Sequence, residues 1–132
     1  MERRSFTVEQ ANRMLPLVRR IVEDLVVTHG RWQQAVGLFE MASNAGAADA
    51  EAFQRETEEL AREIDGYLLE LSALGVEFKG FDQGLIDFPS EVEGRPIYLC
   101  WKLGEPAVAH WHEVDAGFAG RKLLAMAENE AT

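Results

Sequence analysis

Two histidines near the C-terminal end of the chain are the first residues whose spacing suggests chemistry. His110 and His112 are separated by one residue in a segment that reads as a β-strand, so their side chains point to the same face. Such a pair can chelate a divalent metal if a carboxylate joins it. Asp87, in another segment expected to be a strand, and the nearby Glu113 and Asp115 are the candidate carboxylates. The hypothesis is a metal site; the alternative is that the histidines are hydrogen-bonded or solvated without one.

The length of the preceding turn decides which residues the histidines face. A turn made of Gly104-Glu105 alone gives one register, and a turn that includes Pro106 shifts the pairing by one residue and exchanges the two faces. The first register places the histidines beside aliphatic side chains. The second places a cysteine and a tyrosine beside them, which is more typical of a functional site. The sequence leaves both open. The partners of His110 and His112 are Leu99 and Ile97 in the first register, and Cys100 and Tyr98 in the second.

Cys100 is the single cysteine of the chain, so it forms no intrachain disulfide. A thiol near a histidine could act as a nucleophile. Its neighbours Leu99 and Trp101 instead indicate a small buried residue, and a thiol buried in apolar surroundings has a raised pKa and is inert.

A second candidate site lies in the loop that follows the histidines. Gly117 and Gly120 flank this loop, which ends in Arg121-Lys122. Backbone amides freed by glycine, next to two cations, could hold a phosphate or a carboxylate. The alternative is an ordinary turn.

The elements that must position these residues begin with a helix. Thr7 and Gln10 have the spacing of a capping box, which marks the start of a helix. Pro16 either kinks this helix or separates a short helix ending near Met14 from a new one that begins with the proline. We prefer the second interpretation, because proline is common at the first position of a helix.

Two apolar stripes then predict a long antiparallel helical hairpin. Apolar residues recur in alternating steps of three and four over residues 18–42 and again over 53–74, which is typical of packed helices. Asn44-Ala45-Gly46 ends the first helix, and Asp49 is expected to cap the second. The hairpin spans about residues 7–74.

Alternation with period two predicts a small sheet over about residues 76–114, with three or four antiparallel strands. The fold class is therefore α+β. We expect residues 1–122 to form a single domain and residues 123–132 to form a C-terminal tail.

The hairpin is too long for the sheet to cover. A helix of about 25 residues runs to roughly 37 Å, whereas a seven-residue strand covers only about 23 Å. Trp32, Phe39 and Phe53 lie near the tip, where uncovered apolar surface is costly. A second copy of the chain would cover them, so the sequence predicts a homo-oligomer, most simply a dimer.

Composition narrows the class of protein. The 132 residues carry a formal net charge of −10, and 47% of them are hydrophobic, which suits one globular domain rather than a disordered chain. The acidity comes from residues 32–93, with a net charge of −11, and argues against nucleic acid as a partner. No apolar run approaches the roughly 20 residues of a membrane span, and the start lacks the apolar core of a secretory signal. We expect a cytoplasmic protein.

Five motifs make the chain resemble a bacterial family catalogued as domain of unknown function 2203. The resemblance extends over residues 6 to about 121. The family has no established activity, so it implies no function. His112, Asp87, Asp115 and Arg121 fall on the family pattern, whereas His110 lies where the pattern often has an aromatic residue, which shifts the metal hypothesis towards the other residues. The motifs are Phe6-Thr7-x-Glu9-x-Ala11-Asn12-x-x-Leu15-Pro16, Gly75-Val76-Glu77, Gly84-Leu85-x-Asp87-Phe88-Pro89, Leu99-Cys100-Trp101-x-x-Gly104-Glu105 and Trp111-His112-x-x-Asp115-x-Gly117-Phe118-Ala119-Gly120-Arg121.

Two functions follow from these patterns. The first is an oligomeric interaction or structural module whose helical hairpin makes the contacts. The second is a small metal- or anion-binding protein, or an enzyme, with a site at the end of the sheet around His112, Asp87, Asp115 and Arg121. The sequence favours the first, because the helical stripes are its strongest pattern.

Overall fold

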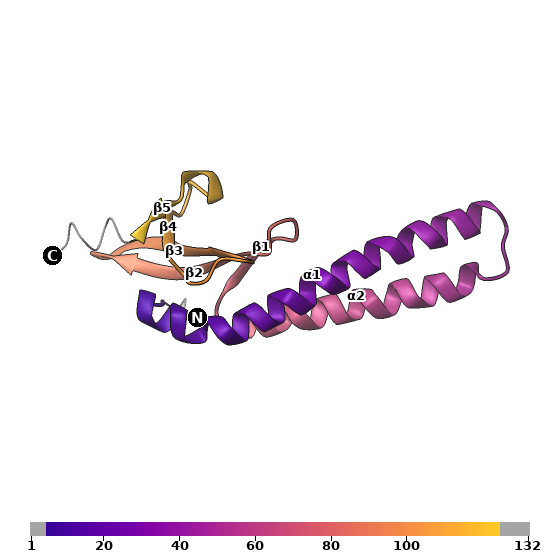
Figure 1. Ribbon diagram of the computed structural model, residues 1–132, viewed down its shortest axis with the longest axis horizontal. Helices are drawn as coiled ribbons and strands as arrows, with labels where there is room; N and C mark the ends of the chain where they lie inside the picture. The colour runs from indigo at the N-terminus through magenta and orange to yellow at the C-terminus, as the bar shows by residue number, and fades with distance from the viewer. Residues whose placement is uncertain (1–4, 125–132) are drawn as a thin grey trace.

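The computed structural model describes residues 5–124 as two long helices and a five-stranded antiparallel sheet (Figure 1). The α+β class is confirmed, but the sheet has one or two strands more than predicted. The elements are α1 (Val8–Asn44), α2 (Ala50–Ala73), β1 (Glu77–Gly80), β2 (Leu85–Val92), β3 (Arg95–Lys102), β4 (His110–Glu113), the 3-10 helix η1 (Phe118–Gly120) and β5 (Lys122–Leu123).

The first helix begins as predicted but does not break at the proline. Thr7 and Gln10 form the capping box. The preferred interpretation of Pro16 is wrong, because α1 continues through it. A proline removes only one backbone donor, and Leu15 and Val18 on either side are buried in the core. Packing of this kind supplies most of the stability of a helix, so the chain stays helical.

The hairpin forms as predicted, with one local difference. Asp49 occupies the N-cap position of α2, but its side chain makes no capping hydrogen bond. The apolar stripes face each other: Leu25 and Ala35 of α1 and Leu60 and Leu71 of α2 are buried. Among the described residues, no helix is long and apolar enough to cross a membrane.

The strands follow one another in space in the order β1-β2-β3-β4-β5. The strand missed by the sequence pattern is β5, in which Lys122 pairs with Trp111 and Leu123 with His110. Two residues are too few to show a period of two, and the sequence prediction assigns Leu123 to the tail. Residues 125–132 of that tail lie outside the described part of the chain.

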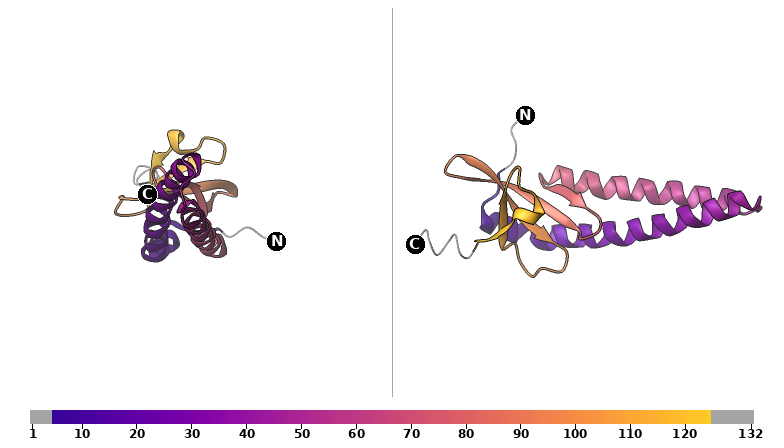
Figure 2. Two further views of the ribbon diagram at one scale, coloured as in Figure 1. Left: turned by 90° about the vertical axis from the view of Figure 1, so that its right-hand side faces the viewer. Right: turned by 90° about the horizontal axis from the view of Figure 1, so that it is seen from above.

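The two faces of the sheet have different surroundings. Ile86, Phe88, Leu99 and Trp101 point towards the helices and are buried in one apolar core with α1. The segment that contains η1 continues into the edge strand β5 and lies away from α1 (Figures 1 and 2). Polar side chains on the other face of the sheet are enclosed as well.

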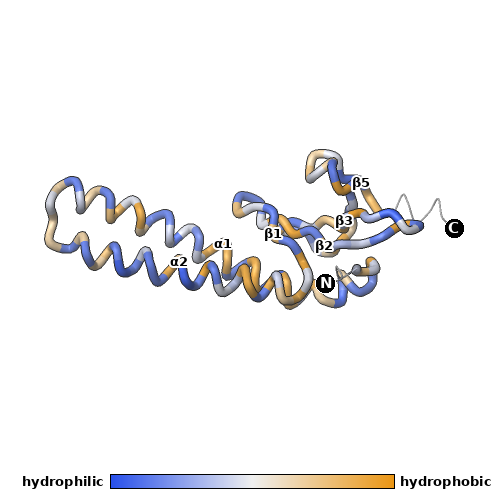
Figure 3. The backbone as a smooth tube through the Cα atoms, turned by 180° about the vertical axis from the view of Figure 1, so that it is seen from behind, coloured by the Kyte–Doolittle hydropathy of each residue, from blue (hydrophilic) through white to orange (hydrophobic). Residues whose placement is uncertain are grey.

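The hairpin projects far beyond the sheet (Figure 1), as the length argument predicted. Phe39 and Phe53 are half-buried in the projecting part. The sequence prediction places Trp32 too near the tip: it is half-buried beside the sheet, where it packs against the core and lines a pocket with Phe81. Hydrophilic residues dominate the outer part of α2 (Figure 3). The oligomer interface proposed for these aromatic residues stays a prediction.

Candidate metal centre

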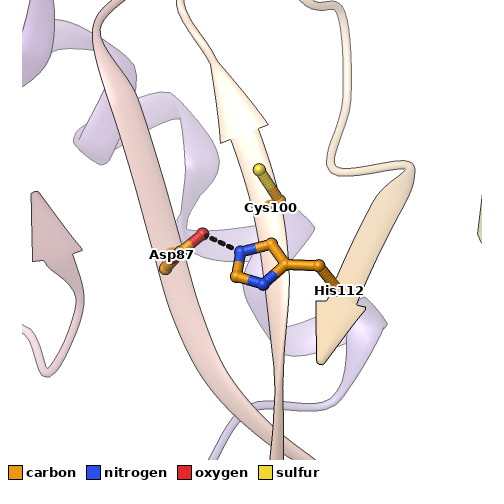
Figure 4. Close-up of side chains that lie close together, drawn as sticks. All are labelled: Asp87, Cys100 and His112. Atoms are coloured by element: carbon orange, nitrogen blue, oxygen red, sulfur yellow. Dashed lines mark hydrogen bonds and ion pairs between the residues drawn. The ribbon is translucent and has the colours of Figure 1, made fainter. Parts of the chain in front are cut away.

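Three side chains of different chemistry converge on the sheet face opposite the helices. Asp87 of β2, Cys100 of β3 and His112 of β4 each offer one ligand atom, and these atoms lie within 4.8 Å of one another (Figure 4). The side chains belong to three adjacent strands. Their residues are 3%, 0% and 2% exposed, respectively, so the cluster is enclosed.

The strand register brings these residues together. Asp87 pairs with Cys100, and His112 pairs with Tyr98, two residues from the cysteine. This is the second of the two registers left open by the sequence, the one in which Pro106 belongs to the turn. All three side chains therefore share one face.

The contact of His112 with a backbone carbonyl fixes the position of one ring hydrogen. Its Nδ1 lies 2.7 Å from the carbonyl oxygen of Glu113, and its Nε2 lies 3.0 Å from Oδ1 of Asp87. A carbonyl only accepts, so Nδ1 carries a hydrogen. The same bond fixes the plane of the ring and directs Nε2 towards the carboxylate, an arrangement typical of histidines that bind metals.

Burial dominates the ionisation of the two other groups. Burial raises the pKa of Asp87, and the hydrogen bond from His112 opposes this only in part. Burial also raises the pKa of the Cys100 thiol to about 11, although Arg121 lies close by. Without a metal the thiol is neutral at physiological pH, and both nitrogens of His112 are engaged. His112 is therefore not free to act as a base for the thiol, which speaks against a cysteine–histidine nucleophile.

An ion pair closes one side of the cluster. Nη1 of Arg121 lies 3.1 Å from Oε1 of Glu105, and Nη2 bonds the other carboxylate oxygen. The Lys102 amide donates to the same carboxylate at 2.9 Å. Nη1 of Arg121 also lies 3.7 Å from Sγ of Cys100, so the pair is in direct contact with the candidate ligands.

A second polar group covers the β1 side. The Tyr98 hydroxyl donates to the carboxylate of Glu77 at 3.0 Å, and Nζ of Lys79 lies 3.0 Å from the same carboxylate. The Tyr98 ring centre lies 5.5 Å from that of His112. Sequence reasoning missed Glu77 and Lys79, because their alternation in a short strand carries no information about their partners across the sheet.

Three of the five predicted metal ligands do not join the cluster. Nδ1 of His110 is buried without a hydrogen bond and lies 3.6 Å from Oε2 of Glu105. Glu113 forms an ion pair with Arg95 at 3.1 Å, and Asp115 is exposed. The structure thus brings together Asp87 and His112 of the predicted set and adds Cys100, which only the second register could have suggested.

The residues of the anion hypothesis already have hydrogen-bond partners within the protein. The amide of Gly120 donates to the carbonyl of Gly117, and the amide of Arg121 donates to that of Phe118. The guanidinium of Arg121 is paired with Glu105. These contacts give the hypothesis no support, and it stays a prediction.

Comparison with known proteins places the chain in a family without assigning it an activity. No curated protein and no solved structure matches it. The model of the uncharacterised conserved proteins designated DUF2203 matches residues 4–124, which confirms the resemblance seen in the motifs. The chain belongs to the DUF2203 family.

Proposed function

We propose that this protein binds a divalent metal ion through Asp87, Cys100 and His112. The observation that carries the proposal is the convergence of a carboxylate, a thiol and an imidazole within 4.8 Å, all buried. Burying three such groups is costly unless they have strong partners, and a metal would satisfy all of them at once. This is the metal alternative of the sequence analysis with Cys100 as a ligand in place of Asp115.

The donor atoms select the kind of metal. A sulfur, a nitrogen and an oxygen suit Zn²⁺ or another thiolate-binding ion, whereas Mg²⁺ and Ca²⁺ prefer oxygen alone. Zinc takes these ligands at about 2.0–2.3 Å, which places ligand atoms roughly 3.3–3.7 Å apart in a tetrahedron. The 3.0 Å contact between His112 Nε2 and Asp87 Oδ1 would therefore open by a few tenths of an ångström.

The test is metal content together with a ligand-specific spectrum. Untagged protein is loaded with zinc, desalted and analysed for metal, and we expect one equivalent. The Cys100→Ser and Asp87→Asn variants should lose it. Asp115→Asn is the matched control, because this exposed carboxylate should be dispensable. Circular dichroism is used to check that each variant is folded.

Cobalt provides a readout that does not depend on any variant. Co²⁺ bound to a thiolate shows a sulfur-to-metal charge-transfer absorption in the near ultraviolet, and only one cysteine is present. Wild-type protein should develop this band with one equivalent of cobalt. A wild type that retains no zinc and shows no such band would overturn the proposal.

The second candidate function is self-association through the helical hairpin. It is favoured by exposed apolar residues of α1, among which Val27 is 63% and Met41 71% exposed. Half-buried Phe39 lies close by. Both Val27→Lys and Met41→Lys should convert a dimer to a monomer in analytical ultracentrifugation, whereas Gln33→Lys, which is also exposed but lies off the helix face shared by Val27 and Met41, should alter this less. A wild type that is monomeric at high micromolar concentration would exclude this function.

A further inference from the structure

We propose that the Arg121–Glu105 ion pair is a clasp that controls access to the proposed metal site. The inference rests on that proposed function for its biological meaning. Its structural basis is separate, since it concerns how the buried Cys100 is covered.

The approach to the site is limited to one face of the sheet. On the other face, Leu99 and Trp101 on either side of the cysteine are packed against α1 in the apolar core. On the open face, Tyr98 pairs with Pro89 and Glu77 pairs with Asp87, so the strand ladders hold both in place. The remaining cover is the segment 114–121, which follows β4 and reaches Cys100 through Arg121.

This segment is weakly held. In the described structure its internal hydrogen bonds are local, such as those of Ala116 to Glu113 and Gly120 to Gly117. The side-chain hydrogen bonds that join it to other elements come from Arg121. The strand that follows, β5, has two residues. Segments with few non-local bonds open at low free-energy cost.

The Arg121–Glu105 ion pair has the geometry of a strong interaction. Two hydrogen bonds join the guanidinium of Arg121 to the carboxylate of Glu105, and paired contacts of this kind are among the stronger ones in proteins. The side chains are 13% and 14% exposed. Phe118 lies beside the guanidinium, with its ring centre 4.6 Å away. One side of the clasp thus faces solvent, and the other contacts Cys100.

A backbone pivot lies within the same segment. Gly117 has φ +67, a conformation that other residues rarely adopt. It stands at the start of η1, four residues before Arg121. Rotation at this glycine would carry Arg121 away from Cys100 without disturbing the pairing of β3 with β4.

The experiment compares wild type with Glu105→Gln, which removes the charge of the clasp. The rate at which metal-free protein reacts with an aromatic disulfide reagent measures exposure of Cys100, and we expect an increase of about ten- to a hundredfold in the variant. Amide hydrogen exchange in residues 114–121 should rise in parallel and does not depend on thiol ionisation. Glu113→Gln, which breaks the more exposed ion pair with Arg95, is the matched control and should change neither rate.

Measurements of zinc uptake and release distinguish a failure of the clasp proposal from a failure of the metal proposal. If both hold, Glu105→Gln binds one equivalent but releases it to a chelator faster than wild type. If wild type takes up no zinc while the thiol and amide rates rise, the clasp stands and the metal function fails. Unchanged thiol and amide rates in Glu105→Gln would overturn the clasp, whatever the zinc content.

Discussion

Nε2 of His112 lies 3.0 Å from Oδ1 of Asp87 in the interior of the protein. Since Nδ1 of the same ring donates to the carbonyl of Glu113, the contact with Asp87 must contain one proton, on the imidazole or on the carboxyl group. In the metal-free protein the two side chains therefore form a neutral unit. Removal of either partner leaves the other buried without its hydrogen bond.

Strong coupling between these two residues is the first prediction. Asp87→Ala and His112→Ala should each lower the free energy of unfolding of the metal-free protein by about 3–5 kcal/mol. The double variant should lose much less than the sum, because the second substitution removes the unpaired group. Urea denaturation with a chelator present measures this. Asp115→Ala should cost under about 0.5 kcal/mol, and strictly additive effects of the two buried substitutions would contradict the coupling.

The pair of Asp87 and His112 shows which parts of the structure could be predicted from the sequence. The helical hairpin, its capping box and the α+β class could be predicted, because they depend on local periodicity and on residues close in sequence. Asp87 and His112 could be named as candidates for the same reason. Their partnership with Cys100 depends on whether Pro106 belongs to the turn before β4. A shift of one residue exchanges the faces of a strand, and no local pattern decides between the two.

The failed predictions share a physical cause. Pro16 is tolerated inside α1 because Leu15 and Val18 are buried, and β5 exists because β4 offers it an edge to pair with. Both are tertiary effects that override local preference. The ligand role of Glu113 and Asp115, which rests on proximity in sequence alone, stays a prediction: Glu113 forms an ion pair with Arg95, and Asp115 is exposed.

The second prediction concerns the junction between the helices and the sheet. Oδ1 of Asn12 accepts from the amide of Val108 at 2.8 Å, and its Nδ2 donates to the carbonyl of the same residue at 3.1 Å. Asn12→Ala leaves both backbone groups without this partner, and we expect a loss of about 1–3 kcal/mol in the free energy of unfolding. Thermal or urea denaturation measures the change. Arg13→Ala removes only an exposed ion pair with Glu9 and should cost under about 0.5 kcal/mol; an equal cost for both would disprove the special role of Asn12.

Stability should depend on pH through the clasp. Burial alone would raise the pKa of Glu105, but hydrogen bonds from Arg121 and from the Lys102 amide outweigh it, and the pKa lies below its ordinary value of 4.5. Between the two pKa values the unfolded chain binds more protons than the folded one, so stability rises with pH in this window. The contribution is complete above the ordinary value and is lost as the pH falls through the folded pKa.

The difference between wild type and Glu105→Gln isolates this contribution, because other titrating groups are common to both. Their free energies of unfolding should differ most near neutral pH and converge below about pH 4.5. Urea denaturation at a series of pH values gives the two curves. A difference that stays constant, or grows as the pH falls, would show that Arg121 does not stabilise the ionised carboxylate.

The last prediction links the metal to the stability of the sheet. A ligand that binds only the folded state stabilises it by RT ln(1 + [L]/Kd), or about 4 kcal/mol at a concentration of 1,000 Kd. Zinc bound to Asp87, Cys100 and His112 would join three adjacent strands, so wild-type protein should melt at a higher temperature with zinc than with a chelator. Cys100→Ser should show a much smaller shift, because it lacks the thiolate, whereas Asp115→Asn should behave as wild type. A shift of equal size in Cys100→Ser and wild type would mean that zinc binds elsewhere, since the cysteine is the ligand that distinguishes this site from an exposed carboxylate cluster.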